Sequence, residues 1–383
     1  MKKTSFLVAT AILICGFTTS LKAQEAITNI FKSGLADLNT VANSYLRPAG
    51  NSLSAGLGSN WYNTADVHKT WGFDLTIGGS VVVAPQSERT FDITGLQNLK
   101  PAVAGTTQAP TFAGKGSGVE LNLMQPHFLK DGTTVNPLWN NGTGKIVSFT
   151  TPKGVSKYIP APTVQFTIGL PIINDVSIRW MPTVKTSDAK VSFWGLGVKH
   201  NFKQWIPGVK MLPFDASVLV AYTKLNADYY FPAESQITPD KLVGGGLGYV
   251  ADPNYTGNYS TQSMKINTKA FTTGIVFSKT LLFFTPYIGV GIIKTNFDVV
   301  LAGDYPTLGN PVLDKNGSPV LNSNNKPIMQ IVNKVDPVKV NGSETMPNAT
   351  FGFRLKFAVI SFHAQYVAQK YATASAGFGI TFR

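Results

Sequence analysis

The sequence predicts an all-β protein, a transmembrane antiparallel β-barrel of about 12–14 strands with a short N-terminal helical plug or extension. Charged residues make up only 14% of the chain and aromatic residues 11%, whereas soluble domains average about 25% charged residues. After residue 23, no apolar run reaches the roughly 18 residues that a membrane helix needs. From residue 51 onward, apolar and polar residues alternate with a period of two, which is the period of a β-strand.

The first 23 residues have the order of a secretory signal peptide. Lys2 and Lys3 precede an apolar run over 6–17, and Ala23 is the small residue at the expected cleavage site. The run is too short to span the ~30 Å hydrocarbon layer of a membrane. Cys15, the only cysteine, lies within it, so we expect no disulfide and no thiolate metal site in the mature chain. The expected division is a signal peptide (1–23), an N-terminal helical plug or extension (24–50) and an outer-membrane β-barrel (51–383).

The basic charge of the chain is spread over its length. The formal net charge is +13, and removing residues 1–23 with their three lysines lowers it by 3 to +10. No arginine-rich block occurs, so we expect no nucleic-acid partner. We interpret the charge as facing anionic lipid headgroups or an anionic ligand, with solubility as the alternative.

Residues 24–50 differ from the rest because their apolar residues follow helical spacing. This spacing predicts one or two short amphipathic helices, which Pro48 and Gly50 should end. The segment could be a periplasmic extension or a plug that enters the barrel, and the sequence leaves both open. The apolar stripe consists of Ile27, Ile30, Phe31, Leu38, Val41 and Tyr45.

The alternating segments predict strands with one apolar and one polar face. In a membrane barrel the apolar face meets lipid and the polar face meets the lumen. A two-sheet sandwich also alternates, but here aromatic residues such as Trp71, Trp180 and Tyr222 stand near segment ends, as in the aromatic girdles of barrels. Twelve strands are expected, at 51–62, 71–83, 117–124, 161–170, 174–182, 190–202, 213–225, 265–278, 284–297, 348–359, 361–370 and 373–383, and 145–150 or 328–345 could raise the number to fourteen.

The connections between these segments fall into two classes. Short turns are expected near 171–173, 279–283 and 359–361. Long polar loops are expected over about 124–160, 226–264 and 298–347. Short turns on one rim and long loops on the other are typical of bacterial barrels. Residues 84–116 fit neither class.

The last strand carries a motif that resembles the C-terminal signal read by the barrel assembly machinery. Its positions are Gly377, Ile380 and Phe382, and Arg383 departs from the usual aromatic last residue. An unpaired terminal strand can be recognised by strand addition at a sheet edge. The resemblance implies the barrel assembly machinery as a partner during insertion.

Two further stretches resemble an uncharacterised family of Gram-negative outer-membrane β-barrel proteins. They are 61–76, which begins Trp-Tyr-Asn-Thr-Ala-Asp, and 197–215, which begins Gly-Val-Lys-His-Asn-Phe. The resemblance covers nearly the whole mature chain and implies no activity. In organisation alone, the chain is also loosely similar to long-chain fatty-acid channel barrels.

Six charged or titratable residues fall on the predicted lumen face. They could form a cationic wall that attracts a carboxylate or phosphate, or salt bridges across the interior, which we favour. The basic members are Arg179, Arg354 and Lys356, with His363 nearby, and the acidic members are Asp74 and Asp215.

The sequence carries no catalytic motif. There is no Gly-x-Ser-x-Gly and no pair of histidines at metal-ligand spacing, so we expect no enzyme, no metal and no cofactor. His363 shares its face with Ser361 and Gln365. Ser361 and His363 could be read as the nucleophile and base that an outer-membrane hydrolase would require. The leading hypothesis is a channel or transporter for small hydrophobic or amphipathic molecules, gated by residues 24–50. The alternatives are a structural or secretion-associated barrel that binds partner proteins and, less favoured, the hydrolase.

Overall fold

The computed structural model describes residues 31, 34–124, 145–172, 174–207, 211–243, 248–251 and 253–382. The expected signal peptide and its cleavage site lie outside the described residues, as does the start of the expected N-terminal helix. In the described part of the chain, no helix is both long and apolar enough to cross a membrane.

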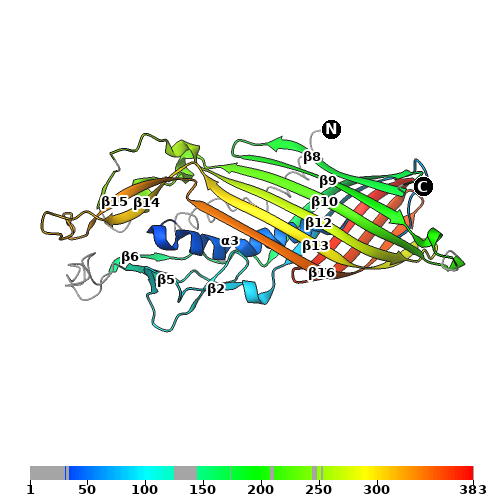
Figure 1. Ribbon diagram of the computed structural model, residues 1–383, viewed down its shortest axis with the longest axis horizontal. Helices are drawn as coiled ribbons and strands as arrows, with labels where there is room; N and C mark the ends of the chain where they lie inside the picture. Colours follow the sequence, from blue (N-terminus) through cyan, green and yellow to red (C-terminus); the bar gives the residue numbers. More distant parts are fainter. Residues whose placement is uncertain are drawn as a thin grey trace.

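Ten of the described strands form a closed antiparallel barrel, which confirms the predicted fold class (Figure 1). Their order around the wall is β1-β18-β17-β16-β13-β12-β10-β9-β8-β7, and β7 pairs with β1 to close the ring. The strands are β1 (Phe73–Val83), β7 (Tyr158–Leu170), β8 (Asn174–Lys185), β9 (Ala189–Asn201), β10 (Asp215–Tyr230), β12 (Ser263–Ser278), β13 (Phe284–Ala302), β16 (Val338–Phe357), β17 (Ile360–Ala368) and β18 (Ala372–Phe382).

The two faces of the wall are divided as the alternation predicts. On β1, Leu75 and Ile77 are exposed on the outside while Asp74 and Thr76 are buried inside. On β13, the outward residues are apolar as far as Ile292 and then become polar at 294, 296 and 298. The apolar belt therefore covers the part of the barrel next to the short turns, and the long strands continue beyond it.

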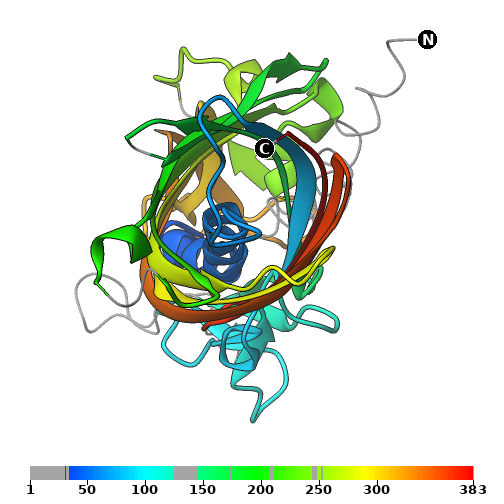
Figure 2. The same cartoon turned by 90° about the vertical axis from the view of Figure 1, so that its right-hand side faces the viewer.

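The N-terminal helix α3 (Gly34–Gly58) passes into the barrel. Figure 2 shows it within the ring of strands, and it contacts β1, β7, β10, β12, β13 and β16 from inside. Residues 50–58 are buried on every side. The chain then continues through the lumen as 59–69 and reaches β1 at the short-turn end. We call residues 34–69 the plug segment.

The expected strand at 51–62 is wrong, because residues 51–58 belong to α3. A helix that is enclosed by a barrel is buried on all faces, so its apolar residues lose the helical period and resemble a strand. The helix also continues through Pro48, since contacts on all sides offset the one helical hydrogen bond that proline cannot make.

The expected strand at 117–124 is also absent from the barrel. Its residues form β5, which lies in a small sheet outside the wall. Of the two candidates for an extra pair of barrel strands, 145–150 lies in a small sheet. The other, 328–345, is divided: 328–335 lie in a small sheet, whereas 338–345 belong to barrel strand β16 and add no further strand. The described barrel therefore has ten strands rather than twelve to fourteen.

The loops between β1 and β7, β10 and β12, and β13 and β16 build a domain beyond the rim, which we call the cap (Figure 1). Residues 84–116, which fit no class of connection in the sequence, form part of it. Its strands are β2 (Thr90–Asp92), β3 (Leu99–Pro101), β4 (Gln108–Pro110), β5 (Glu120–Met124), β6 (Lys145–Thr150), β11 (Gly248–Val250), β14 (Asp304–Pro311) and β15 (Ile328–Val335), and its helices are η1 (Gln86–Glu88), η5 (Ala233–Ser235), α4 (Pro239–Leu242) and η6 (Tyr259–Thr261); a further turn, η3 (Lys203–Trp205), lies at the short-turn end.

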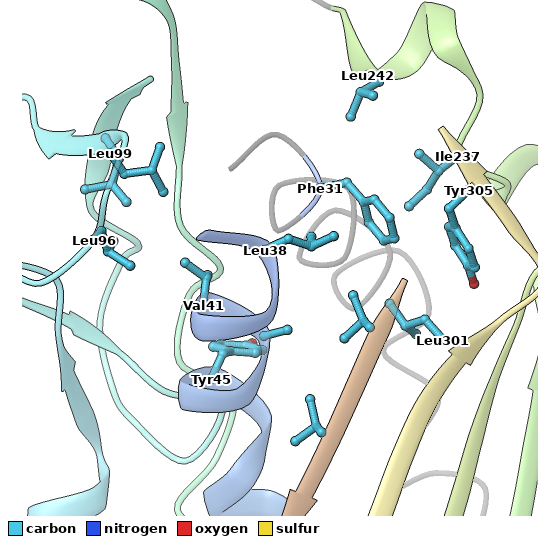
Figure 3. Packing of buried hydrophobic residues seen from close by; sticks show 14 of the residues in the cluster. Phe31, Leu38, Val41, Tyr45, Leu96, Leu99, Ile237, Leu242, Leu301 and Tyr305 are labelled. Carbon is cyan, nitrogen blue, oxygen red and sulfur yellow. The ribbon is translucent and has the colours of Figure 1, made fainter. Parts of the chain in front are cut away.

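The main hydrophobic core lies between the cap and the first half of α3 (Figure 3). Leu38, Val41 and Tyr45 are buried there against cap residues such as Leu99. Phe31 stacks on Tyr305 of β14 with ring centroids 4.8 Å apart. The first half of the helix is therefore anchored in the cap, and only its second half occupies the barrel.

Candidate functional site: the lumen and its plug

The barrel wall caps the C-terminal end of α3. A helix leaves its last four carbonyl groups without helical partners. Here Arg179 Nη1 donates to Leu57 O over 2.9 Å, and Thr223 Oγ1 donates to the same oxygen over 3.3 Å. Thr272 Oγ1 donates to Gly58 O over 2.7 Å. Three different strands thus fix the depth at which the helix ends.

Arg179 is the central contact between wall and plug. Its side chain is fully buried. Nε donates to Gln165 Oε1 over 3.0 Å, and Nη2 donates to Ser59 O over 3.0 Å and to Asn60 O over 2.6 Å. The guanidinium carbon lies 3.8 Å from the centroid of the Trp61 ring, within the range of a cation–π contact. In the described residues no carboxylate forms an ion pair with this arginine, so neutral acceptors and the C-terminal end of the helix compensate its charge.

A second polar group holds the plug near the short-turn end. Asp175 accepts hydrogen bonds from the backbone N–H of His68 and contacts its Nδ1, each over 2.9 Å. Lys199 Nζ lies 3.0 Å from Asp175 Oδ2 and donates to Thr64 O and Asp66 O over 3.1 and 2.9 Å. This wall ion pair therefore has both of its partners bonded to the plug.

A third group joins Asp74 and Arg354, whose Oδ2 and Nη2 atoms lie 3.4 Å apart. The hydroxyls of Thr76 and Thr381 also donate to Asp74. His363 Nε2 lies 2.9 Å from Asn60 Oδ1 of the plug. Four of the six lumen residues chosen from the sequence, Arg179, Arg354, His363 and Asp74, are thus buried in the interior.

The other two candidates do not join these groups. Lys356 and Asp215 are half-buried and lie toward the short-turn ends of β16 and β10. The arrangement of Arg354 with Asp74 is a salt bridge, as in the alternative that we favoured from the sequence. His363 bonds to Asn60 rather than to Ser361, whose hydroxyl contacts Thr381.

Sequence reasoning missed two wall residues, Asp175 and Lys199. Asp175 has the same strand parity as Arg179, and Lys199 has the same parity as Gly195 and Gly197, so the alternation contained the signal. The plug residues that they hold, Thr64, Asp66 and His68, follow the segment 51–62 that was predicted as a wall strand, so their place in the lumen could not be predicted.

Glycines make room for the plug's aromatic residues. A Cβ atom at Gly197 would lie 2.8 Å from the Trp61 ring, and one at Gly289 would lie 2.3 Å from the Tyr62 hydroxyl. Only glycine allows these rings to lie against the wall.

Two small cavities lie in the lumen beside the plug. The larger, about 30 Å³, is lined by Trp61, His68, Asp175 and His363 among others, and the smaller is about 20 Å³. Each holds roughly one or two water molecules. Trp61 Nε1, His68 Nε2 and His363 Nδ1 are buried without a hydrogen-bond partner, which is consistent with water there.

The assembly motif lies in the closing strand. Gly377, Ile380 and Phe382 belong to β18, which pairs with β17 on one side and β1 on the other. Ile380 and Phe382 point outward and are exposed.

The fold and the filled lumen define a plugged β-barrel of the outer-membrane type. The chain belongs to a family of unknown function, DUF6588, whose model matches residues 1–382. No curated protein matches its sequence.

Several solved outer-membrane barrels are similar in outline. Ail, the attachment invasion locus protein of Yersinia pestis, is 7% identical with a TM-score of 0.23, over 82% of this chain and 99% of Ail. The toluene transporter TbuX of Ralstonia pickettii is 8% identical with a TM-score of 0.21, over 89% and 98%. A mutant of the monoaromatic hydrocarbon channel TodX is 9% identical with a TM-score of 0.20, over 88% and 98%. At these scores the likeness carries no argument about function.

Proposed function

We propose that this protein is an outer-membrane transporter for small hydrophobic or amphipathic molecules, closed at rest by its own plug segment. One observation carries the proposal: the lumenal part of the plug, 59–69, is held largely by polar side chains of the wall that bond to its backbone. Water can replace such bonds, because each contributes only about 0.5–1.5 kcal/mol net, or about 1.5–3 kcal/mol where a charged group takes part.

The two halves of the plug are held in different ways. The first half of α3 lies in the main hydrophobic core with the cap, and separating it would expose a large apolar surface. The extended part lies beside two water-sized cavities. Residues 59–69 are therefore the part that moves in this proposal, while 34–47 remain in place. The sequence assigned the gate to 24–50, whereas we propose that 59–69 form it.

The lumen also suits small solutes of mixed polarity. Buried threonines and serines line much of it, and apolar patches around Leu53 and Ala55 of the helix alternate with them. An amphipathic molecule could exchange contacts with both kinds of surface along the path. We propose no catalytic role, since His363 and Ser361 are bonded to other residues.

A reversible lock tests the proposal. Thr64 Oγ1 of the moving segment lies 3.1 Å from Ser278 Oγ of the wall, so cysteines at these two positions would place their sulfur atoms within reach of a disulfide. We expect a Thr64→Cys/Ser278→Cys variant in lipid bilayers to show no conductance or dye uptake when oxidised, and the wild-type level after reduction. The two single-cysteine variants are the controls. Equal permeability in the oxidised and reduced states contradicts a moving plug.

The second candidate is a structural barrel that binds partner proteins, and the cap favours it. The helix and three long loops share one continuous core beyond the rim, which is the arrangement of a rigid display platform. Two results together would favour this function over transport. The wild type and the reduced cysteine variant would conduct nothing, and deletion of cap residues 312–327 would abolish capture of a partner without unfolding the barrel.

A further inference from the structure

The barrel wall is parted between β7 and β8. These two strands pair only from Gln165 with Arg179 to Leu170 with Asn174. Nearer the cap, residues 158–164 of β7 continue to pair with β1, and β8 beyond Trp180 continues to pair with β9. No described pairing joins 158–164 to 180–185. We call this stretch the seam.

The seam is encoded by prolines. Gly169 donates to Gly72 O over 2.8 Å, and Lys157 O accepts from Ala84 N over 3.0 Å, so the odd-numbered residues of β7 bond toward β1. Along a strand, successive residues bond to opposite sides, and the even-numbered residues therefore face β8. Two of these are Pro160 and Pro162, which have no N–H to donate.

An apolar cluster lies directly behind the seam. It joins Leu53 and Leu57 of α3 to Ala161 of β7 and Phe193 of β9. Ile159 and Met181, one from each edge of the seam, pack against this cluster and are only half-buried. The hydrogen-bonded groups around Arg179 begin below it. Ile159 and Met181 thus form the accessible margin of an apolar patch whose inner residues are buried.

The outer side of the seam joins the lipid-facing surface. Phe166 and Trp180 stand at its lower end and are 39% and 63% exposed. Three lysines stand at its upper end, with Asp188 in the turn between β8 and β9. They are Lys157, Lys185 and Lys190, of which Lys185 and Lys190 are cross-strand partners. The seam therefore runs from the apolar belt to a basic rim.

We propose that the seam is a binding site for a membrane lipid with a phosphate headgroup. One acyl chain lies against Ile159 and Met181 and reaches the cluster at Leu53, and the phosphate lies among the rim lysines. Membrane lipid is the occupant because the seam is continuous with the surface that lipid covers. The positive charge at its upper end matches the level of anionic headgroups.

Native mass spectrometry of the full barrel tests the site. With phosphatidylglycerol as the probe, we expect the wild type to keep one lipid after the others are stripped. Met181→Glu places a charge against the chain and should abolish this retention. Lys157→Gln/Lys185→Gln should weaken it about tenfold. The matched control is Lys265→Gln/Lys294→Gln, which removes two exposed lysines from β12 and β13, away from the seam, and should leave retention unchanged.

Two results overturn the proposal. One is equal retention of phosphatidylglycerol by the wild type and Met181→Glu, with both barrels shown to be folded by their altered gel mobility before boiling. The other is retention of palmitate in place of phosphatidylglycerol, which would assign the seam to free amphiphiles.

A second variant closes the seam without adding charge. Pro160→Val/Pro162→Thr restores two N–H donors on the β8 side, so we expect the strands to pair and amide exchange at 180–185 to slow to the level of β9. Lipid retention should then be lost. A wild type whose 180–185 amides are already as protected as those of β9, or a closed variant that keeps its lipid, contradicts the open seam.

Discussion

Arg179 offers the sharpest test of how the plug is held. Changing it to glutamine removes the guanidinium that bonds to Leu57 O, Ser59 O and Asn60 O. Leu57 O keeps its bond from Thr223, so two carbonyls, Ser59 O and Asn60 O, lose their donor from the wall. Each buried acceptor left unsatisfied costs about 1–3 kcal/mol, which gives about 2–6 kcal/mol in total. Because water can enter from the adjacent cavity, we expect a loss of about 2–3 kcal/mol in the free energy of unfolding.

The measurement is equilibrium urea unfolding in micelles, followed by gel mobility, together with amide exchange at 59–61. Arg179→Lys keeps the charge but loses the fork of donors, and should fall between the wild type and Arg179→Gln. Arg47→Gln is the matched control. Its side chain is 54% exposed, with a 3.8 Å contact to Glu344, so its effect should stay within about 0.5 kcal/mol. If Arg179→Gln is as stable as Arg47→Gln, with unchanged exchange at 59–61, the wall does not hold the plug through this residue.

Three further predictions follow from the wall and the expected export. Phe353→Arg, on the outer face, should cost about 2–4 kcal/mol of folding free energy in lipid. Asn296→Arg also points outward but lies beyond the apolar belt, so it should cost little. Equal losses for the two variants in urea titrations would contradict the assigned position of the belt. Gly197→Val places a side chain against the Trp61 ring and should lower the free energy of unfolding by about 1–3 kcal/mol. Gly79→Val should lower it less, because the nearest atoms lie 3.7 Å from an added Cβ. The opposite order in the same urea titrations would contradict the packing of the plug against the wall. Protein extracted from outer membranes should have the intact mass of a chain that begins at Gln24; the mass of the full-length chain would refute the predicted signal peptide.

The barrel could be predicted from the sequence because strand alternation is a local property. Phe351 and Phe353 alternate with Gly352 and Arg354, and the structure places the first pair outside and Arg354 inside. Assigning residues to the inner or outer face needs only the two-residue period and the knowledge that the outer face meets lipid. The same parity identified Arg179, Arg354, His363 and Asp74 as interior residues.

The strand number could not be predicted in the same way. Residues 117–124 have the composition of a strand and do form β5, but nothing local states whether a strand pairs with the wall or with a loop. The core of the cap joins residues far apart in the chain: Leu99 and Leu38 belong to one buried cluster, and Tyr305 stacks on Phe31. Such contacts depend on how the barrel brings its loop ends together.

By itself, then, the sequence determined the class of fold, the two faces of each wall strand and the helical nature of the N-terminal segment, because each rests on the spacing of neighbouring residues. Tertiary structure alone decided that the helix continues through Pro48 into the lumen, that Arg179 bonds to its last carbonyls, and that β7 parts from β8. The physical reason is enclosure. Inside a ring of strands every face of the plug is buried, so its own pattern no longer shows which surface it meets, and the wall supplies the partners that the local sequence lacks.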